Sequence, residues 1–256
     1  WEVEVVTIRF EDGIGGVAST VDVRDGDYQR SLVIGEFNGD GMQDFATANN
    51  ASDNVCIRFG DGAGGFTATT NVSVGNDPLS IAIGDFNGDG MQDFATANES
   101  GSNVSIRLGD GTGGFTSATD VSVGVLPSSI AIGDFNGDGM QDFATANYND
   151  DDVSIRLGDG TGGFASATNV SVGGNPISIA IGDFNGDGMQ DFATANFNGA
   201  NVSIRLGDGT GGFTSATDVT VGIYQRSIAI GDFNGDGMQY FATANYNDDH
   251  VTISPT

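Results

Sequence analysis

The chain has 256 residues, of which 42 are Gly, and it carries 35 acidic side chains against 8 basic ones, all Arg, for a formal charge of −27 at pH 7. This charge repels nucleic-acid phosphates and anionic membrane surfaces, so we expect no nucleic-acid binding. No apolar run approaches about 18 residues, so we expect no membrane insertion. The high Gly content disfavours a helical protein, because Gly weakens helix interiors.

The first predicted elements lie at residues 5–23, where VVTIRFEDGIGGVASTVDV matches the second half of a repeat that runs through the whole chain. The motif GDFNGDGMQDF, or a close variant, begins at residues 35, 84, 133, 182 and 231, a step of 49 residues. A period of this length is typical of propeller blades and solenoid coils. We therefore predict a single domain over residues 1–256 built from five such repeats.

Within one repeat, residues 80–128, four stretches alternate apolar and polar or small side chains: SIAIGDF, QDFATAN, NVSIRLG and FTSATDVSV. This two-residue period is that of β-strands. Turns rich in Gly, Asn or Asp separate the stretches. Four meandering strands per repeat make up a propeller blade, so we predict an all-β fold, a five-bladed β-propeller of four-stranded antiparallel blades.

The two ends of the chain predict how this ring closes. The last complete elements, RSIAIGDFN and MQYFATANY, match the first half of a repeat, and the N-terminal strands match the second half. We expect the N-terminal strands to complete the last blade, which would remove exposed sheet edges. Residues 6–8 and 251–253 are equivalent and compete for one strand position. The N-terminal copy is favoured because it is continuous with its hairpin partner, and residues after Asp248 would form a tail or an added outer strand.

The loop between the first two strands of each repeat has the residue pattern of a calcium loop. From Asp85 to Asp93, side-chain oxygens fall at positions 1, 3, 5 and 9, Gly90 lies at position 6, and Met91 offers its carbonyl at position 7. Ca²⁺ prefers about six to eight hard oxygen ligands, and Gly permits the sharp turn. Three carboxylates this close would repel one another without a cation. Position 12 is Thr96 in place of a closing Glu, so Asp93 must replace it. The alternative is an Asx-rich turn without metal.

These stretches resemble the VCBS repeat and the related FG-GAP repeat of integrin-α-like propellers. The resemblance rests on GDFNGDGMQDFATAN and NVSIRLGDGTGGF and covers nearly the whole chain. The Phe-Gly pair survives only at residues 59–60, and the Gly-Ala-Pro element is absent, so the VCBS form is the closer match. The resemblance implies up to five Ca²⁺ ions, one in the first loop of each blade. The implied ligands are Glu36, Asn38, Asp40, Met42, Asp44, Asp85, Asn87, Asp89, Met91, Asp93, Asp134, Asn136, Asp138, Met140, Asp142, Asp183, Asn185, Asp187, Met189, Asp191, Asp232, Asn234, Asp236 and Met238.

Two of the five loops depart from the pattern. Glu36 replaces the first Asp, and its extra methylene is expected to distort that site. Tyr240 replaces the ninth-position Asp of the last loop, which leaves that loop one carboxylate short. We therefore expect the weakest calcium occupancy in the Asp232 loop.

Three other sequence features are interpreted as structural. GDGTGG at residues 109–114 has the spacing of a dinucleotide loop, but a strand pattern follows it, so we predict a hairpin turn formed by its Asp. The recurring Arg of the third strand is predicted to pair with a carboxylate between blades, and an anion-binding ring is the alternative. Its four copies are Arg58, Arg107, Arg156 and Arg205. Cys56 stands alone where other repeats have Ser, so no disulfide forms within the chain and we expect no reactive thiol.

The repeats differ chiefly in two loops, before the first strand and before the third strand. In an up-and-down blade these loops emerge on one side, and the metal loop and Gly-rich turn emerge on the other. The variable face therefore predicts a recognition surface, since aromatic residues and Arg are favoured at interfaces. Its candidate residues are Tyr28, Arg30, Tyr148, Phe197, Tyr224, Arg226 and Tyr246. The alternative is that surface loops simply tolerate change.

We expect a non-catalytic, monomeric, extracellular or cell-surface module for binding, adhesion or scaffolding, with an unknown protein or glycan partner. The alternatives are a glycan-binding lectin with sites between blades and, less favoured, a polysaccharide lyase or hydrolase. One His, His250, and one Cys supply no nucleophilic catalytic set, and no carboxylate pair stands out. The chain begins at Trp1 without a basic and apolar leader, so either a signal peptide has been removed or the chain is part of a longer protein. The near-identity of the repeats indicates recent amplification or engineering.

Overall fold

The computed structural model describes residues 5–14, 16–246 and 250–255. Within these residues the regular elements are strands, apart from one short 3₁₀ turn at Asn50–Ser52. None of the helical segments there has the length and hydropathy of a membrane span. The alternating sequence pattern thus becomes an all-β fold, as predicted.

The strands form five consecutive antiparallel sheets preceded by a hairpin. The hairpin is β1 (Val5–Glu11) and β2 (Val17–Arg24). The first sheet is β3 (Gln29–Gly35), β4 (Asp44–Asn49), β5 (Asn54–Gly60) and β6 (Phe66–Ser73), and the second is β7 (Pro78–Gly84), β8 (Asp93–Asn98), β9 (Asn103–Gly109), β10 (Phe115–Ser117) and β11 (Val121–Ser122). Because β10 and β11 both pair with β9, they share the fourth position of that sheet.

The remaining sheets repeat the same order. The third is β12 (Pro127–Gly133), β13 (Asp142–Asn147), β14 (Asp152–Gly158) and β15 (Phe164–Ser171), and the fourth is β16 (Pro176–Gly182), β17 (Asp191–Asn196), β18 (Asn201–Gly207) and β19 (Phe213–Thr220). The fifth has three strands, β20 (Gln225–Gly231), β21 (Tyr240–Asn245) and β22 (His250–Pro255). The predicted meander of neighbouring strands is therefore confirmed.

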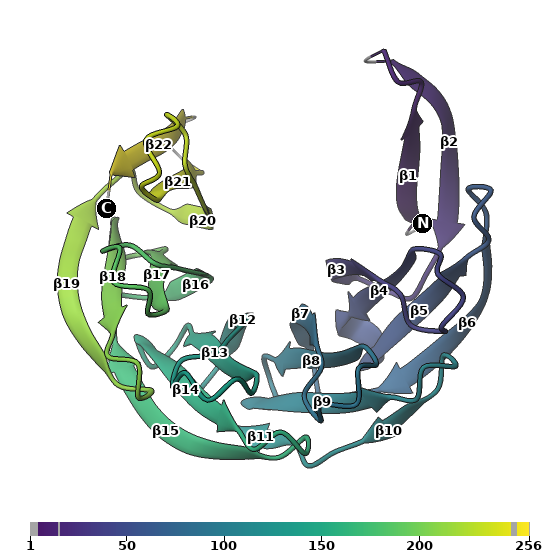
Figure 1. Ribbon diagram of the computed structural model, residues 1–256. Helices are drawn as coiled ribbons and strands as arrows, with labels where there is room; N and C mark the ends of the chain where they lie inside the picture. The colour runs from purple at the N-terminus through teal and green to yellow at the C-terminus, as the bar shows by residue number, and fades with distance from the viewer. Residues whose placement is uncertain (1–4, 15, 247–249, 256) are drawn as a thin grey trace.

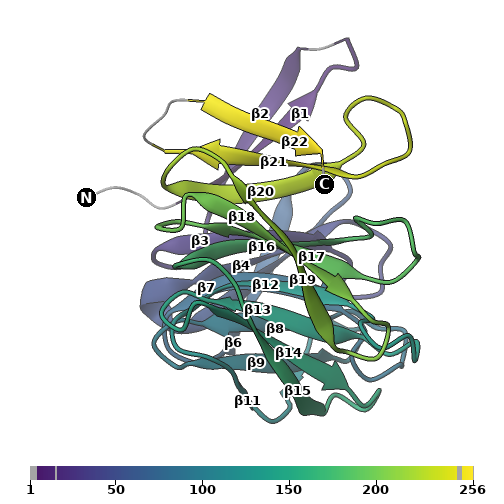
Figure 2. The same ribbon diagram turned by 90° about the vertical axis from the view of Figure 1, so that its left-hand side faces the viewer.

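The sheets follow one another around an arc. Their first strands lie on its inner side, and β6, β15 and β19 lie on its outer side (Figure 1). The β1–β2 hairpin stands at one end of the arc and the fifth sheet at the other (Figure 1). Seen from the side, successive sheets lie stacked on one another (Figure 2).

Four hydrophobic clusters hold neighbouring sheets together, and each has the same composition. In the first, Ala46, Ala48 and Ile57 of the first sheet pack against Ile81 and Phe94 of the second, and all five are buried. The later clusters repeat this pairing one repeat further along. Alternation along each strand therefore gives every sheet two different apolar faces, an Ala/Val/Ile face and an Ile/Phe face.

The predicted ring closure is not what the structure has. β22 pairs with β21 over six residue pairs, from Tyr240–Pro255 to Asn245–His250, and so holds the third-strand position of the last sheet. β1 pairs with β2 and belongs to a separate two-stranded sheet. The preference for the N-terminal copy in that position is thus wrong. β22 follows β21 directly along the chain, so it pairs at a much smaller loop-closure entropy cost than β1 would.

Candidate metal loops and a candidate recognition surface

Each acidic loop folds around the carboxylate of its first residue. In the loop that begins at Asp85, one carboxylate oxygen accepts the backbone N–H of Gly88 at 2.7 Å and the other accepts that of Gly90 at 2.9 Å. Both Gly residues have positive φ, +74° and +81°, a backbone conformation that favours Gly. The loops that begin at Asp134 and Asp183 repeat these bonds.

The middle of the loop is tied by Asn87 and Asp89. The Asn87 side-chain amide donates to one Asp89 carboxylate oxygen at 2.8 Å, and the other oxygen accepts the N–H of Met91 at 2.8 Å. The Met91 side chain is 43% exposed. The loop therefore satisfies its polar side chains largely with its own amides, as an Asx-rich turn does.

The ninth-position carboxylate is buried and joins three segments. The two oxygens of Asp93 accept the N–H of Phe86 at 2.8 Å and the N–H of Gly109, at the end of β9, at 2.8 Å. The Asp93 side chain is fully buried. Burial, opposed by these two hydrogen bonds and reinforced by the charges of Asp89 and Asp85, raises the pKa of Asp93 to about 6. Asp44, Asp142 and Asp191 form the same pair of bonds in their own sheets.

The donor set of these loops suits a hard cation in its chemistry, because it consists of carboxylate, amide and carbonyl oxygens. The repulsion that Asp89 and Asp85 exert on Asp93 means that their charges lie near one another. Within the described part of the chain, however, no three His, Cys, Asp or Glu side chains are grouped so as to hold a metal ion. The loops have the hydrogen bonds of Asx turns, and each carboxylate has further lone pairs beyond those that accept the loop amides.

In the two loops that depart from the repeat pattern, the substituted residues change the hydrogen bonds of the loop. Glu36 reaches the loop amides with one oxygen, which accepts the N–H of Asn38 at 3.0 Å and that of Gly39 at 2.6 Å. In the last loop, the Tyr240 hydroxyl donates to Asp236 at 2.8 Å and accepts from the Asn234 amide at 2.7 Å. The hydrogen bond to Asp236 raises the pKa of Tyr240. Tyr240 thus engages two of the predicted ligands itself.

Replacing Tyr240 with Asp is expected to raise the calcium affinity of the last loop, because it frees Asn234 and Asp236 and supplies a further carboxylate. Titration calorimetry on the wild type and on Tyr240→Asp measures the effect, which we expect to be on the order of tenfold in that site's Kd. Tyr240→Phe serves as the control, since it frees the same two side chains without adding a ligand. Equal titrations for the wild type and Tyr240→Asp would remove the ninth position from the ligand set.

A Gln that the sequence analysis missed fastens three of the acidic loops, those that begin at Glu36, Asp85 and Asp134, to the next sheet. The Gln141 carbonyl oxygen accepts the N–H of Asp85 at 2.8 Å, and the N–H of Gly162 donates to the carbonyl of Phe86 at 2.9 Å. These bonds place the acidic loops and the Gly-rich turns on one side of the molecule, as predicted. The available signal was the Gln that precedes the ninth residue in all five copies of the motif: Gln43, Gln92, Gln141, Gln190 and Gln239.

The Gly-rich segments form the predicted turns, and three of the four recurring Arg residues have the predicted carboxylate partner. Asp110 forms the turn between β9 and β10, since its carboxylate accepts the N–H of Thr112 and of Gly114, and these bonds lower its pKa. The Arg107 guanidinium donates to the carbonyl of Ser73 in the preceding sheet at 2.9 Å and lies 3.2 Å from Asp120. Arg58 and Arg205 also have carboxylate partners, whereas Arg156 bonds Asn169 instead.

Cys56 is an inert thiol, as the sequence indicates. Its side chain is buried and donates to the Asn71 side-chain oxygen at 2.8 Å. Burial, with Asp25 nearby, raises the pKa of the Cys56 thiol to about 11. Because the thiolate is the reactive form, this environment suppresses its chemistry near neutral pH.

Five of the seven candidate recognition residues come together in one stack. The Phe197 ring lies 6.5 Å from Tyr148 and 4.9 Å from Tyr224, between centroids. The Arg226 guanidinium lies 4.7 Å from the Phe197 ring centre and 5.2 Å from that of Tyr246. We call Tyr148, Phe197, Tyr224, Arg226 and Tyr246 the aromatic–Arg cluster. It joins loops of the third, fourth and fifth sheets.

The other two candidates, Tyr28 and Arg30, lie at the equivalent place on the first sheet, toward the other end of the arc (Figure 1). The two variable loops of a sheet lie together, because the N–H of Tyr246 donates to the carbonyl of Tyr224, and Asn50 does the same to Tyr28. Tyr28, Tyr224 and Leu126 adopt φ values of 57°, 58° and 56°, which are rare for bulky side chains.

Comparison with known proteins gives a family and a set of structural relatives. The model of the FG-GAP-like repeat matches residues 36–96, 85–145, 134–194 and 183–243. Among curated proteins no significant match is found.

The solved structures that resemble this chain are propeller proteins of low sequence identity. One, a protein of unknown function from Desulfotomaculum acetoxidans, has 11% identity and a TM-score of 0.69 over 98% of this chain and 76% of its own. Virginiamycin B lyase from Staphylococcus aureus has 13% identity and a TM-score of 0.64 over 99% of this chain and 78% of its own. An Agrocybe aegerita lectin that recognises non-reducing terminal N-acetylglucosamine has 18% identity and a TM-score of 0.56 over 93% of this chain and 65% of its own. These likenesses concern the fold alone. The repeated acidic loop, the stacked four-stranded sheets and the matched repeats together mean that the chain belongs to the FG-GAP-like repeat family, a family of β-propellers.

Proposed function

We propose that this chain is a non-catalytic binding module that contacts its partner through the aromatic–Arg cluster on the variable face. The observation that carries this proposal is the continuous contact of four aromatic rings and a guanidinium drawn from three successive blades. Aromatic and Arg side chains dominate the binding energy of most interfaces. The cluster is accessible, since Tyr246 is 66% exposed and Arg226 is also exposed.

Backbone strain on the same face supports the proposal. Non-Gly residues with φ between 48° and 58° recur in the variable loops, among them Leu126, Asn175 and Tyr224. Such conformations cost about 1–3 kcal/mol each and tend to gather at binding sites. The acidic loops of the opposite face use Gly wherever φ is positive, Gly88 and Gly90 being examples. Strain is therefore concentrated where the repeats differ.

We further propose that the acidic loops bind Ca²⁺ and that the module works outside the cell, where calcium is abundant enough to fill even weak sites. Support comes from the oxygen donor set and from the like charges crowded around Asp93. In this role the ions stabilise the blades and do not take part in chemistry, because binding to the folded state alone stabilises it.

A glycan is the favoured class of partner among the alternatives, because the flat faces of aromatic rings stack on sugar rings. The cluster offers Tyr148, Phe197 and Tyr224 in a row of neighbouring rings. The structural resemblance to a lectin concerns the fold and adds only that this architecture is compatible with sugar recognition.

Phe197→Ala is expected to weaken partner binding by about tenfold to a hundredfold, since Phe197 is the ring that touches Tyr148, Tyr224 and Arg226. Binding to a glycan array and to an array of secreted and cell-surface proteins measures the effect and separates the two partner classes. Tyr28→Ala is the control, because it removes an exposed Tyr of the same variable face that is equivalent to Tyr224 and lies outside the cluster. Equal loss in both variants, with thermal unfolding unchanged, would contradict the assignment of the cluster.

A further inference from the structure

One face of the first sheet is more exposed than the same face of the other four sheets. Leu32 is 42% exposed, whereas its equivalents Ile81, Ile130, Ile179 and Ile228 are 5–7% exposed. Ile34, the next residue of β3 on the same face as Leu32, is 63% exposed. This Ile/Phe face is the one that the other sheets pack against the preceding sheet.

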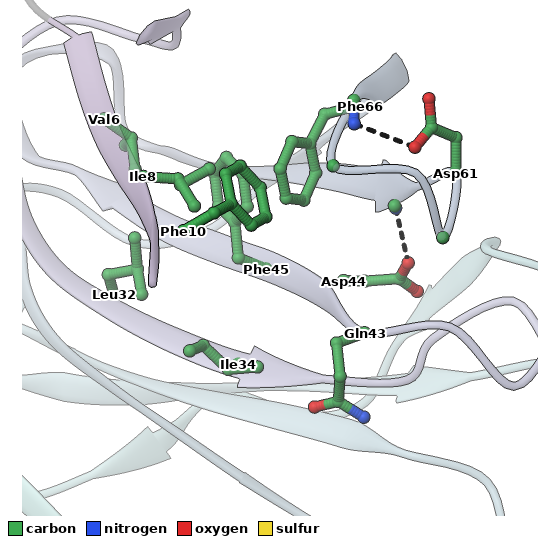
Figure 3. Close-up of a pocket in the computed structure, with 14 residues that line it drawn as sticks. Val6, Ile8, Phe10, Leu32, Ile34, Gln43, Asp44, Phe45, Asp61 and Phe66 are labelled. Atoms are coloured by element: carbon green, nitrogen blue, oxygen red, sulfur yellow. Dashed lines mark hydrogen bonds between the residues drawn. The ribbon is translucent and has the colours of Figure 1, made fainter. Parts of the chain in front are cut away.

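The β1–β2 hairpin covers only part of that face. Val6, Ile8 and Phe10 of β1 point toward Phe45 and Phe66 and line a cavity of about 310 Å³ with them (Figure 3). They are the equivalents of Val55, Ile57 and Phe59 in β5, so the hairpin supplies the third and fourth strands of a sheet. Among the residues that the structure describes, none forms the first and second strands of that sheet, which would cover Leu32 and Ile34.

The opposite end of the arc presents the complementary surface. Ala244 of β21 is exposed, whereas its equivalents Ala48, Ala97, Ala146 and Ala195 are fully buried. Val251 of β22 is 61% exposed, whereas Val55, Val104, Val153 and Val202 are fully buried. This is the Ala/Val/Ile face, and in the four internal interfaces it packs against the Ile/Phe face of the next sheet.

We propose that these two ends bind each other between molecules, so that the fifth sheet of one copy docks on the first sheet of a second copy. Both halves of an interface that the chain uses four times internally are open together in one molecule, and the ends stand apart on the arc (Figure 1). The open area is also continuous with the contact that the hairpin already makes on the first sheet. Such a head-to-tail contact leaves one free end on each side of the dimer, so further copies can bind at either end.

Docking brings β1 of one copy and β22 of the other to the same strand position. β1 is anchored by seven residue pairs with β2 and by the packing of Phe10 on Gly64. β22 has only β21 as a paired neighbour. For β20, β21, β1 and β2 to complete a four-stranded sheet across the interface, β22 and its Val251 must leave β21, so the docking face that remains is that of β21 with Ala244. The pairing of β21 with β1 of the other copy leaves no exposed edge on β21.

The net charge of −27 opposes this association, so salt is expected to promote it by screening. Sedimentation at about 0.3 M NaCl, from about 1 to 300 µM protein, measures the mass against concentration. We expect the average mass to rise through dimer to larger species. A constant monomer mass over this range would overturn the proposal.

Two end-blocking variants give the sharper test. Ile34→Glu blocks the Ile/Phe end and Ala244→Glu blocks the Ala/Val/Ile end, and each alone is expected to be monomeric. Mixed together, they are expected to form a 1:1 dimer and nothing larger, because one intact end of each kind remains. Ile14→Glu changes an Ile that is 92% exposed at the tip of the hairpin, and it is expected to associate like the wild type.

The mixture also distinguishes the competing arrangements. A symmetric contact between two Ile/Phe ends would let Ala244→Glu associate alone, and that result would overturn the proposal. Closure of the ring within one chain would leave the wild type and the mixture monomeric. Because both substituted residues are exposed, folding is expected to persist, and thermal unfolding of each variant verifies this. The glycan or protein binding proposed above does not enter this experiment.

Discussion

Replacing Asp93 with Ala is expected to lower the free energy of unfolding by about 2–4 kcal/mol, one of the two largest effects that the structure predicts. The side chain is fully buried, and its two oxygens accept the N–H groups of Phe86 and Gly109. Removal of the carboxylate leaves both amides without that partner, at a cost of about 1–3 kcal/mol each. It also disconnects the acidic loop from the end of β9.

Urea unfolding followed by circular dichroism measures the change, with Asp110→Ala as the matched control. Asp110 also accepts two backbone N–H groups, but it does so in an exposed turn. Water can replace its bonds, so we expect an effect below about 1 kcal/mol. If Asp93→Ala were no more destabilising than Asp110→Ala, the ninth-position carboxylate would not be the bridge that its geometry indicates.

The sequence was sufficient to predict the strands, their order and the stacking of the sheets, because these depend on short-range patterns that repeat. Ile81 and Phe94 lie on the predicted strands and are buried between sheets, and the Gly-rich segment after β9 is a hairpin turn. Repetition made each of these inferences testable within the sequence itself.

The sequence could not predict how the arc ends, because that outcome depends on a competition between equivalent segments. Residues 6–8 and 251–253 carry the same Val-Thr-Ile pattern, so side-chain chemistry does not separate them. Chain connectivity separates the two segments, since β22 follows β21 directly along the chain and pairs with it. The role of Gln141 was hidden for a related reason: its partner, the amide of Asp85, lies on another sheet and can be recognised only once the sheets are stacked.

The candidate recognition residues also show which features the sequence predicts and which appear only once the sheets are stacked. Variation between repeats marked the loops correctly, and the aromatic–Arg cluster lies there. The sequence alone did not separate Tyr28 and Arg30 from their equivalents Tyr224 and Arg226. Only the latter pair has Phe197 as a neighbour, because Phe197 belongs to the adjacent fourth sheet.

Adding calcium to protein stripped with EDTA is expected to raise the unfolding temperature, and this is the second large effect. Each loop that binds contributes RT ln(1 + [Ca²⁺]/Kd), about 2.7 kcal/mol when calcium is at a hundred times Kd. The loops that begin at Asp85, Asp134 and Asp183 have the full ligand pattern, so their contributions should dominate. Thermal unfolding in calcium, in magnesium and in EDTA at pH 7.5 measures the effect. Identical transitions in calcium and EDTA would leave the loops as metal-free Asx turns.

The pH dependence of this stabilisation follows from the buried carboxylates. Burial raises the pKa of Asp93 in the folded protein to about 6, against 3.8 for a free Asp, and it also raises the pKa of Asp142 and Asp191. The protonated form of all three is therefore favoured by folding. The stability that Asp93 contributes is fully present below pH 3.8 and is lost as the pH rises through about 6. Without calcium, the protein is expected to gain stability from these groups when the pH falls from 7 to 5.

Calcium reverses that trend, because a ligand carboxylate must be ionised. Binding near pH 6 is therefore expected to release protons from Asp93, and the stabilisation by calcium should grow from pH 5 to 7.5. Calorimetric titration in two buffers of different ionisation enthalpy counts the released protons. Asp93→Asn is expected to remove its share of both the proton release and the calcium-free pH dependence. Calcium binding with no proton release at pH 6 would mean that the ion is held without the buried carboxylate, by the exposed part of the loop alone.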